Sequence, residues 1–438
     1  MTIATRHQTQ VSAGSRKGLL RRGIGLLAGC LILIAGCADQ SPRDAQSAGE
    51  GIEYGADKQA YIDALADMEP VTLTLQSSAP KGAATGRRFE EYAAAVQDWS
   101  GGKITFDIAF ANAIAPPAEV DDALADGRID VGSVLPMLDP AEFPANGALW
   151  EAAVLGRQTP VDGMLQWHGA VLQAAAGQDE FYTEFEDRGI TLLLPVYHSG
   201  SFGYMCRQAR TDLPDLAGAT IATQSLGQAA EARALGMNPV TITYAEMFES
   251  LQRGVVDCTA STFTVAVLGG FIPEASHVVI DPEVGWAIAG GAIAVNKQTW
   301  DGLPLAAQQL MYDRLDVLLR VNFESTWDNV QAGLDEVSKA GGSVSAPSPE
   351  VRDALEAANN DILKSVADNP ALSDGAGFVD ELRTDTQAWQ DTVAELDLGQ
   401  DVSYQTFPEW YTQTGGKPDL DSYFDTLWSE AMADRRPQ

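Results

Sequence analysis

The chain has 438 residues, of which 45% are hydrophobic, and its formal net charge is −33. This length is sufficient for two domains, each with a sizeable hydrophobic core. The acidic charge excludes a nucleic-acid-binding protein, which needs a basic surface, and indicates a strongly solvated surface or adaptation to salt.

Residues 1–36 have the pattern of a lipoprotein signal peptide. Four basic residues lie at positions 16–22, and the apolar residues 23–36 are too few to span a bilayer as a helix of about 20 residues. The apolar stretch ends in I-A-G-C, so we expect cleavage before Cys37 and acylation of its thiol, which would anchor the protein to a membrane. The alternatives are L-A-G-C ending at Cys30, with a shorter apolar core, and an ordinary membrane anchor.

Residues 37–69 are polar and acidic, and we expect them to form a tether with one short helical turn near its end. Alternating apolar residues then predict strands from residue 71 and over 104–110. Between them, Phe89, Tyr92, Val96 and Trp99 form one face of a helix. Strands that alternate with helices predict an α/β protein with mostly parallel sheets.

A helix–glycine–strand unit occurs twice, at residues 118–133 and 245–261. The matched residues are Ala118, Glu119, Leu124, Gly127 and Asp130 in the first copy and Ala245, Glu246, Leu251, Gly254 and Asp257 in the second. Each glycine is expected to end its helix in the left-handed conformation, and Val255 is expected to open a buried strand. A unit used twice predicts two similar α/β lobes with a cleft between them.

The chain is expected to cross between the lobes twice, around residues 191–200, where a buried strand leads into a short polar segment, and again over 281–295. Two crossings leave a hinge free to close on a ligand. Residues 305–340 show the longest helical pattern, about 50 Å in length. Further helices begin at Ser348, and the final residues, including Arg435 and Arg436, are interpreted as a solvated tail.

Four motifs recur in a fixed order: D-L-A-G-A-T-I-A-T at 215–223, A-L-G-M-N-P-V-T-I at 234–242, A-E-M-F-E-S-L-Q-R-G-V-V-D at 245–257 and V-N-K-Q-T-W-D-G-L-P at 295–304. In this order and at these spacings, roughly residues 70–340 resemble the substrate-binding proteins of TRAP (tripartite, ATP-independent, periplasmic) transporters. The resemblance implies a two-lobed, periplasmic-binding-protein-like α/β fold, with a hinge and a long helix that spans both lobes.

We expect residues 70–195 and 285–320 to form lobe I, residues 196–284 and 321–400 to form lobe II, and residues 401–438 to form a C-terminal extension. Cys206 and Cys258 both fall on predicted strands of lobe II. Outside the cell such a pair is a disulfide candidate, with two buried free thiols as the alternative.

The motifs of an enzyme are missing from the sequence. After residue 36 the histidines are His168, His198 and His277, and G-S-F-G at 200–203 is not a G-x-S-x-G nucleophile motif. The sequence has no His or Cys pair at zinc spacing and no phosphate-binding glycine loop. The sequence therefore predicts a binding protein with no catalytic residues, no metal and no cofactor.

In two-lobed α/β proteins the ligand meets the carboxyl ends of the strands and the loops that follow them. The expected ligand-binding residues are Ser77, Ser133, Trp150, Phe202, Thr223, Gln224, Tyr244, Ser261 and Trp286. By the resemblance, Tyr244 falls where the family often has an aromatic residue against the ligand, and Ser261 where it often has asparagine. For each residue, ordinary loop or core packing is the alternative.

The family motif D-L-K-G-x-K-I-R-V carries an arginine that binds the ligand carboxylate through two hydrogen bonds. Ala222 occupies this position, and a second family arginine would fall near Phe202. Arg207 and Arg210 could replace it only through a shift of register. Because a buried carboxylate needs a cation, the sequence slightly favours a neutral or zwitterionic ligand over a dicarboxylate, the family's default.

The sequence thus predicts an extracytoplasmic, lipid-anchored protein that captures a small organic solute by hinge closure. By the resemblance, it would deliver the solute to TRAP permease subunits in the membrane, which an ion gradient drives. The alternatives are a binding protein that feeds a sensor kinase or another transporter and, less favoured, a secreted hydrolase.

Overall fold

The structure is a computed structural model that describes residues 51–400 and 402–438. The predicted signal peptide, Cys37 and the first part of the predicted tether lie outside the described residues. None of the described helices is both long and apolar enough to cross a bilayer.

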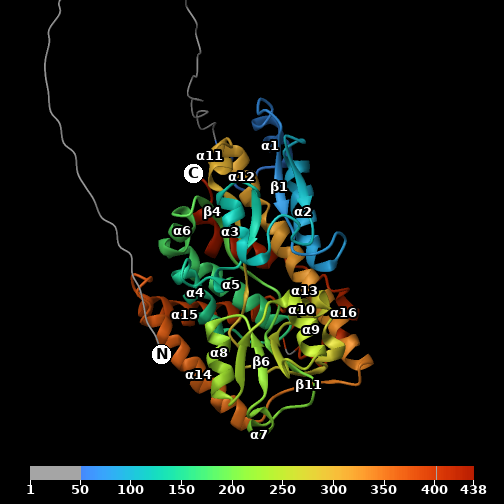
Figure 1. Cartoon of the computed structure of the whole chain (residues 1–438). Helices are drawn as coiled ribbons and strands as arrows, with labels where there is room; N and C mark the ends of the chain where they lie inside the picture. Colours follow the sequence, from blue (N-terminus) through green and yellow to red (C-terminus); the bar gives the residue numbers. More distant parts are fainter. Residues whose placement is uncertain (1–50, 401) are drawn as a thin grey trace, which may run out of the picture. The chain divides into compact units, whose positions relative to one another are not determined.

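Two separate sheets, each with its own helices, confirm the predicted two-lobed α/β fold (Figure 1). Sheet A has the order β2-β1-β3-β10-β4. Its strands are β1 (Val71–Gln76), β2 (Ile104–Ala109), β3 (Val131–Val134), β4 (Ile190–His198) and β10 (Gly290–Asn296). Sheet B has the order β11-β9-β5-β8-β6-β7. Its strands are β5 (Gly203–Cys206), β6 (Thr220–Thr223), β7 (Asn238–Thr241), β8 (Cys258–Ser261), β9 (His277–Val279) and β11 (Ser343–Ser345).

Both sheets are mixed, whereas we expected mostly parallel pairing. β1 pairs in parallel with β2 and β3, and β6 does so with β7 and β8. The strand that follows each crossover, β5 in sheet B and β10 in sheet A, is antiparallel to both of its neighbours. A chain that arrives from the other lobe enters the sheet from the opposite end, which explains the reversal.

Cys206 of β5 and Cys258 of β8 are register partners in sheet B. They form the expected disulfide, and their Cα atoms are 4.1 Å apart. This separation is slightly shorter than the usual range of about 4.4–6.8 Å for disulfides.

The two copies of the repeat build equivalent corners around α3 (Val120–Ala125) and α9 (Met247–Gln252). Gly127 and Gly254 follow these helices with φ of 78° and 70°, a conformation that only glycine adopts without a steric penalty. Asp130 Oδ2 then accepts a hydrogen bond from the backbone nitrogen of Thr74 in β1 (2.7 Å). In the same way, Asp257 Oδ2 accepts one from the backbone nitrogen of Thr220 in β6 (2.9 Å). The aspartate thus ties each unit to the neighbouring strand.

The strand of the second copy begins later than predicted, because β8 starts at Cys258. Val255 is 59% exposed, and its backbone nitrogen donates to the Ser250 carbonyl oxygen, so it belongs to the turn after α9.

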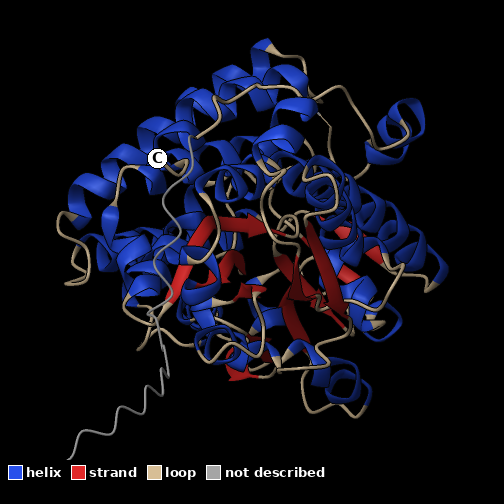
Figure 2. Ribbon diagram, turned by 90° about the horizontal axis from the view of Figure 1, so that it is seen from above, coloured by secondary structure: helices blue, strands red, loops and turns tan. Residues whose placement is uncertain are grey.

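Helices surround the strands of both sheets (Figure 2). Those along the first part of the chain are α1 (Lys58–Ala64), α2 (Arg87–Trp99), α4 (Pro144–Glu151), α5 (Asp162–Ala176) and α6 (Asp179–Glu186). Those that follow are α7 (Leu213–Leu216), α8 (Leu226–Ala234), α10 (Phe263–Gly269), α11 (Lys297–Asp301) and α12 (Leu305–Asp313). The last are α13 (Leu315–Lys339), α14 (Pro349–Ala367), α15 (Gly375–Glu395), α16 (Phe407–Thr414) and α17 (Asp421–Leu427). Of these, α15 packs along α5, and α14 packs against α8 (Figure 1).

Shorter helical turns link several of these elements. They are η1 (Ala84–Gly86), η2 (Pro117–Glu119), η3 (Pro136–Leu138), η4 (Ala152–Leu155), η5 (Tyr244–Glu246), η6 (Ile272–Glu274), η7 (Trp428–Met432) and η8 (Ala433–Arg435).

The single long helix predicted over 305–340 is interrupted at Arg314. Asp313 forms a buried ion pair with Arg436, and Arg314 lies over the ring of Trp99, so both side chains hold the turn between α12 and α13. The 25 residues of α13 still reach about 37 Å. They pack on α2 beside sheet A and on α10 beside sheet B, so α13 contacts both lobes.

The two ends of the described chain correct two expectations. Residues 58–65 do not form part of a free tether, because α1 buries Tyr61 and Leu65 and the Tyr61 hydroxyl donates to Asp313. The C-terminal residues are not a solvated tail, because Tyr423 and Leu427 are in the core and Arg436 is 8% exposed. The ion pair of Arg436 with Asp313 explains why the last residues are held in place.

Candidate ligand-binding site

A cavity of about 320 Å³ is lined by residues that follow strands of both sheets. Apolar and polar residues line it in equal number, but most of the surface that faces the cavity is apolar. The apolar residues are Pro116, Pro117, Ala118, Val120, Leu135, Met137, Leu138, Phe202, Ile242, Ala245, Val265, Leu268 and Ala289. The polar ones are Gln76, Ser78, Thr85, Arg88, Asn112, Ser133, Tyr197, Ser199, Gln224, Thr241, Thr243, Tyr244 and Thr264. The position and composition are those of a pocket for a small organic ligand.

Four of the nine residues expected from the sequence line this cavity: Ser133, Phe202, Gln224 and Tyr244. Ser133, Gln224 and Tyr244 lie near the end of a strand or shortly after it, as the rule about carboxyl ends of strands requires. Phe202 directly precedes β5, which is antiparallel to β8, so the start of β5 lies beside the end of β8. Ser133 is also in hydrogen-bond contact with the hydroxyl of Tyr197, at the end of β4.

The other five residues, Ser77, Trp150, Thr223, Ser261 and Trp286, are buried and do not line the cavity. Trp150 lies in helix α4, and its ring packs against Trp167 in the core. Trp286 packs against Tyr204, and the hydroxyls of Ser77 and Ser261 donate to nearby backbone carbonyls. Successive side chains at the end of a strand point to opposite faces of the sheet, so only some of them can reach the cleft.

Arg88, the second residue of α2, is the charged cavity residue that the sequence patterns did not predict. Its side chain is 4% exposed, and its guanidinium carbon lies 4.5 Å from the centre of the Tyr197 ring. Nη1 donates to Asn322 Oδ1 at 2.8 Å, whereas Nε has no partner among the described residues. Burial lowers the pKa of Arg88 and Tyr197 opposes this shift, but an arginine keeps its charge in proteins.

No carboxylate of the described chain forms an ion pair with Arg88, which is also the one Lys, Arg or His among the described lining residues. Its neighbour Arg87 lies 3.0 Å from Asp328 on the outside of the same helix turn. The sequence does contain a pattern that distinguishes the buried Arg88 from its neighbour Arg87. Arg88 lies four residues before Tyr92, on the buried face of the predicted helix.

The positions considered for a family arginine do not supply a cation to the cavity. Ala222 is fully buried in β6, and Arg207 is exposed. Arg210 donates to the carbonyl oxygen of Asp215. The cation of this cavity therefore comes from α2, beside sheet A, rather than from a strand of sheet B.

One direct hydrogen bond links the two sides of the cavity. Asn112 follows β2 with φ of 54°, and its Nδ2 donates to the hydroxyl of Tyr244 at 2.8 Å. Tyr244 follows β7 of sheet B. A residue from each lobe thus meets at the edge of the cavity.

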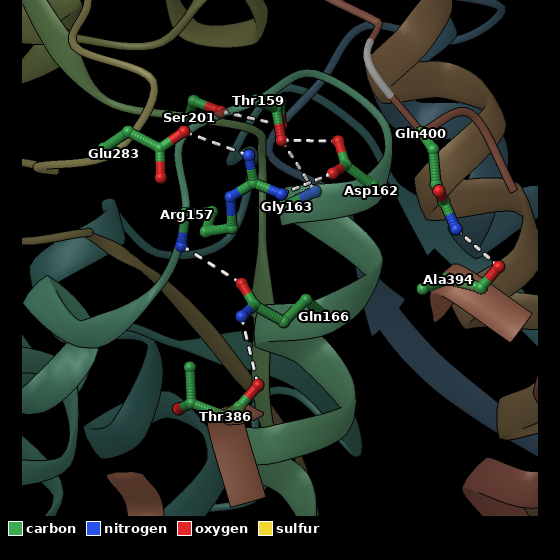
Figure 3. A network of polar contacts seen from close by, with 10 residues as sticks. All are labelled: Arg157, Thr159, Asp162, Gly163, Gln166, Ser201, Glu283, Thr386, Ala394 and Gln400. Atoms are coloured by element: carbon green, nitrogen blue, oxygen red, sulfur yellow. Dashed lines mark hydrogen bonds and ion pairs between the residues drawn. The ribbon is translucent and has the colours of Figure 1, made fainter. Parts of the chain in front are cut away.

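A polar network joins α5 to both crossovers (Figure 3). Arg157 forms ion pairs with Asp162 at the start of α5 (2.8 Å) and with Glu283 of the return crossover (3.0 Å). Asp162 also accepts a hydrogen bond from Thr159, whose carbonyl oxygen accepts one from Ser201 of the first crossover. The two crossovers are therefore held side by side.

The family model of the bacterial extracellular solute-binding proteins, family 7 (DctP), matches residues 75–369. The chain belongs to this family. The resemblance to TRAP solute-binding proteins is thereby confirmed, and so is the prediction that the protein is not an enzyme, because the family binds solutes.

The C4-dicarboxylate-binding periplasmic protein DctP of Rhodobacter capsulatus is 31% identical to the chain over 136 residues. This match spans 31% of the chain and 39% of that relative, well under half of either.

Two solved TRAP solute-binding proteins share the fold of this family 7 chain. A marine metagenome protein specific for pyroglutamate has a TM-score of 0.61 at 18% identity, over 72% of this chain and 100% of its own. A Bordetella bronchiseptica protein with bound (R)- and (S)-mandelate has a TM-score of 0.62 at 19% identity, over 73% of this chain and 99% of its own.

Proposed function

We propose that the protein captures a small organic monocarboxylate outside the cytoplasm and delivers it to a TRAP-type permease. Arg88 carries this proposal, because it brings a positive charge into the cavity without a carboxylate partner in the described chain. A buried cation is costly unless it is paired, and a ligand carboxylate would pair it. This replaces the expectation of a neutral or zwitterionic ligand.

The rest of the lining favours one carboxylate over two. Proline, leucine and other apolar side chains supply most of the surface that faces the cavity, and no second cation lines it in the described chain. A second carboxylate would lose its hydration without gaining a counter-charge. Pyroglutamate and mandelate, which bind to two of the solved relatives, each have one carboxylate beside a ring.

Three further features complete the proposal. Cys37 would carry the lipid anchor, as its position after the apolar segment suggests. Residues 70–195 with 285–320 and residues 196–284 with 321–400 would act as the two lobes that close about the crossovers. The bridge from Asn112 to Tyr244 supports closure, because it joins residues of both lobes over the cavity.

Calorimetry and thermal shift with (R)-mandelate, pyroglutamate and succinate test the ligand class. We expect the two monocarboxylates to bind more tightly than succinate and to raise the melting temperature by mass action. Arg88→Gln should weaken their binding by about 10- to 100-fold, the contribution of a hydrogen bond to a charged group. Arg87→Gln, which removes the neighbouring external charge, is the control and should have little effect. Preferred binding of succinate, or unchanged binding by Arg88→Gln, would contradict the proposal.

A further inference from the structure

We infer that Asn322 is a positioning residue that fixes the guanidinium of Arg88 while leaving its positive charge available to the ligand. The inference rests on the proposed function, because it concerns the same carboxylate site. Asn322 lies on α13, is fully buried and faces α2, on which Arg88 lies. It does not line the cavity itself.

The hydrogen bonds of Asn322 determine which way its amide points. Nδ2 donates to the carbonyl oxygen of His198 at 3.0 Å, and Oδ1 accepts from Arg88 Nη1 at 2.8 Å. A peptide carbonyl can only accept and a guanidinium can only donate, so the reversed amide would face two mismatched partners. Asn322 therefore has a single orientation that satisfies both neighbours.

The His198 carbonyl that holds Asn322 is itself held in place by uncharged side chains. The backbone nitrogen of His198 donates to His168 Nε2 at 3.2 Å, and the two rings stack with centres 4.1 Å apart. Burial lowers the pKa of His168 to about 4, and burial together with His168 lowers the pKa of His198 well below its usual value. Both rings are neutral at physiological pH, so they fix the position of the His198 carbonyl without adding charge near Arg88.

An amide suits this position better than either a carboxylate or an apolar side chain. An aspartate would accept the same hydrogen bond but would neutralise the guanidinium, leaving less attraction for a ligand carboxylate. An apolar residue would leave Nη1 of Arg88 and the carbonyl oxygen of His198 unpaired. Asn322 therefore sets the preference of the site for an acid over its neutral amide.

The test compares (R)-mandelate with (R)-mandelamide, its primary amide, by calorimetry at pH 7. Asn322→Asp should raise the Kd of mandelate at least about tenfold relative to the Kd of mandelamide, since it converts a free cation into an ion pair. Asn359→Asp is the matched control. Asn359 is also buried, and its Nδ2 donates to the carbonyl oxygen of Gly285, but it forms no hydrogen bond with an arginine among the described residues. This variant should leave the ratio of the two Kd values unchanged.

A ligand-free measurement tests the same contact if folding is affected. The free energies of unfolding of the wild type, Arg88→Met, Asn322→Asp and the double variant form a thermodynamic cycle. We expect the Asn322→Asp change to be coupled favourably to Arg88, because the new carboxylate loses its counter-charge in the Arg88→Met background.

The outcomes separate the inference from the proposed function. If Arg88→Gln weakens mandelate binding but Asn322→Asp leaves the acid-to-amide ratio unchanged, the inference is wrong and the proposed function stands. If Arg88→Gln leaves mandelate binding unchanged, or the wild type binds neither mandelate nor pyroglutamate, the proposed function is wrong. A cycle without coupling would overturn the inference independently of any ligand.

Discussion

Glu231 of α8 is fully buried, and only one of its carboxyl oxygens has a partner among the described residues. Oε1 accepts a hydrogen bond from the backbone nitrogen of Ala287, in the return crossover, at 2.8 Å. Burial, together with the charge of Glu151, raises the pKa of Glu231 well above its usual value. The side chain is therefore protonated in the folded protein under conditions in which the unfolded chain carries it ionised.

Replacing Glu231 by glutamine should stabilise the protein increasingly as the pH rises. A raised folded pKa means that the contribution of the acid to stability is complete below the unfolded pKa of about 4.3 and is lost as the pH rises towards the folded value. Within that window the wild type loses up to about 1.4 kcal/mol per pH unit relative to Glu231→Gln. Urea unfolding at pH 4, 5.5 and 7 measures the difference.

Glu249→Gln is the control, because Glu249 is exposed and pairs only with exposed Arg253 among the described residues. A stability difference between Glu231→Gln and the wild type that does not change with pH would show that Glu231 is ionised in the folded protein.

Single residues were the hardest part of the site to predict from the sequence. The rule that ligands meet strand ends identified Ser133 and Tyr244, but it could not tell which face each neighbouring side chain would take. The same rule predicts ligand contacts from the loops after strands, whereas Arg88 lies on a helix. Its partner Asn322 is 234 residues away in the chain, and no local pattern connects the two.

At the scale of elements, the contact between α13 and α10 is unusually close at Gly333. A Cβ atom at this position would meet Phe263 Cδ1 at 2.3 Å, so the glycine allows the two helices to approach each other. We expect Gly333→Ala to cost about 1–3 kcal/mol by overpacking, in spite of the better helix propensity of alanine.

Urea unfolding measures this cost. Gly177→Ala at the end of α5 is the control, because a Cβ there would meet nothing closer than 3.7 Å, and it should be neutral or slightly stabilising. Equal stability of Gly333→Ala and the wild type would mean that α10 can move away from α13 without loss of packing.

Elements with a strong local pattern were predicted well. The alternation in β1 and β2, the amphipathic face of α2 and both copies of the helix–glycine–strand unit follow from residues next to one another in the chain. The break at Arg314 and the antiparallel β5 and β10 depend instead on distant partners. Arg436 pairs with the last residue of α12. The strand after each crossover runs antiparallel because the chain enters the sheet from the other lobe.

At the scale of the whole molecule, the hydrogen bond from Asn112 to Tyr244 should help to hold the lobes closed. Such a hydrogen bond contributes a net free energy of about 0.5–1.5 kcal/mol. Asn112→Ala and Tyr244→Phe should therefore each weaken mandelate binding by about 2- to 10-fold. The radius of gyration without ligand, from small-angle scattering, should increase in both variants.

Both residues also line the cavity, so a double variant is needed to separate the bridge from direct ligand contacts. If the two residues act through their mutual hydrogen bond, the double variant should bind no more weakly than either single one. Additive losses would indicate separate contacts with the ligand.

The insertion of β10 between β3 and β4 has a consequence for the order in which the protein folds. Five strands of sheet B lie within residues 203–279, and only its edge strand β11 comes later. Sheet A, in contrast, receives an interior strand from residues 290–296, so β3 lacks a partner on one side and edge strand β4 lacks its one partner in the sheet until this late segment arrives. Contacts between distant segments form slowly because a long loop must first be closed.

We expect refolding monitored by pulsed hydrogen exchange to protect the amides of β6 and β8 before those of β4 and β10. Simultaneous protection of all four strands would indicate one cooperative step instead. By this reasoning, the lobe encoded second in the gene assembles the main part of its sheet first, before its edge strand β11 is added.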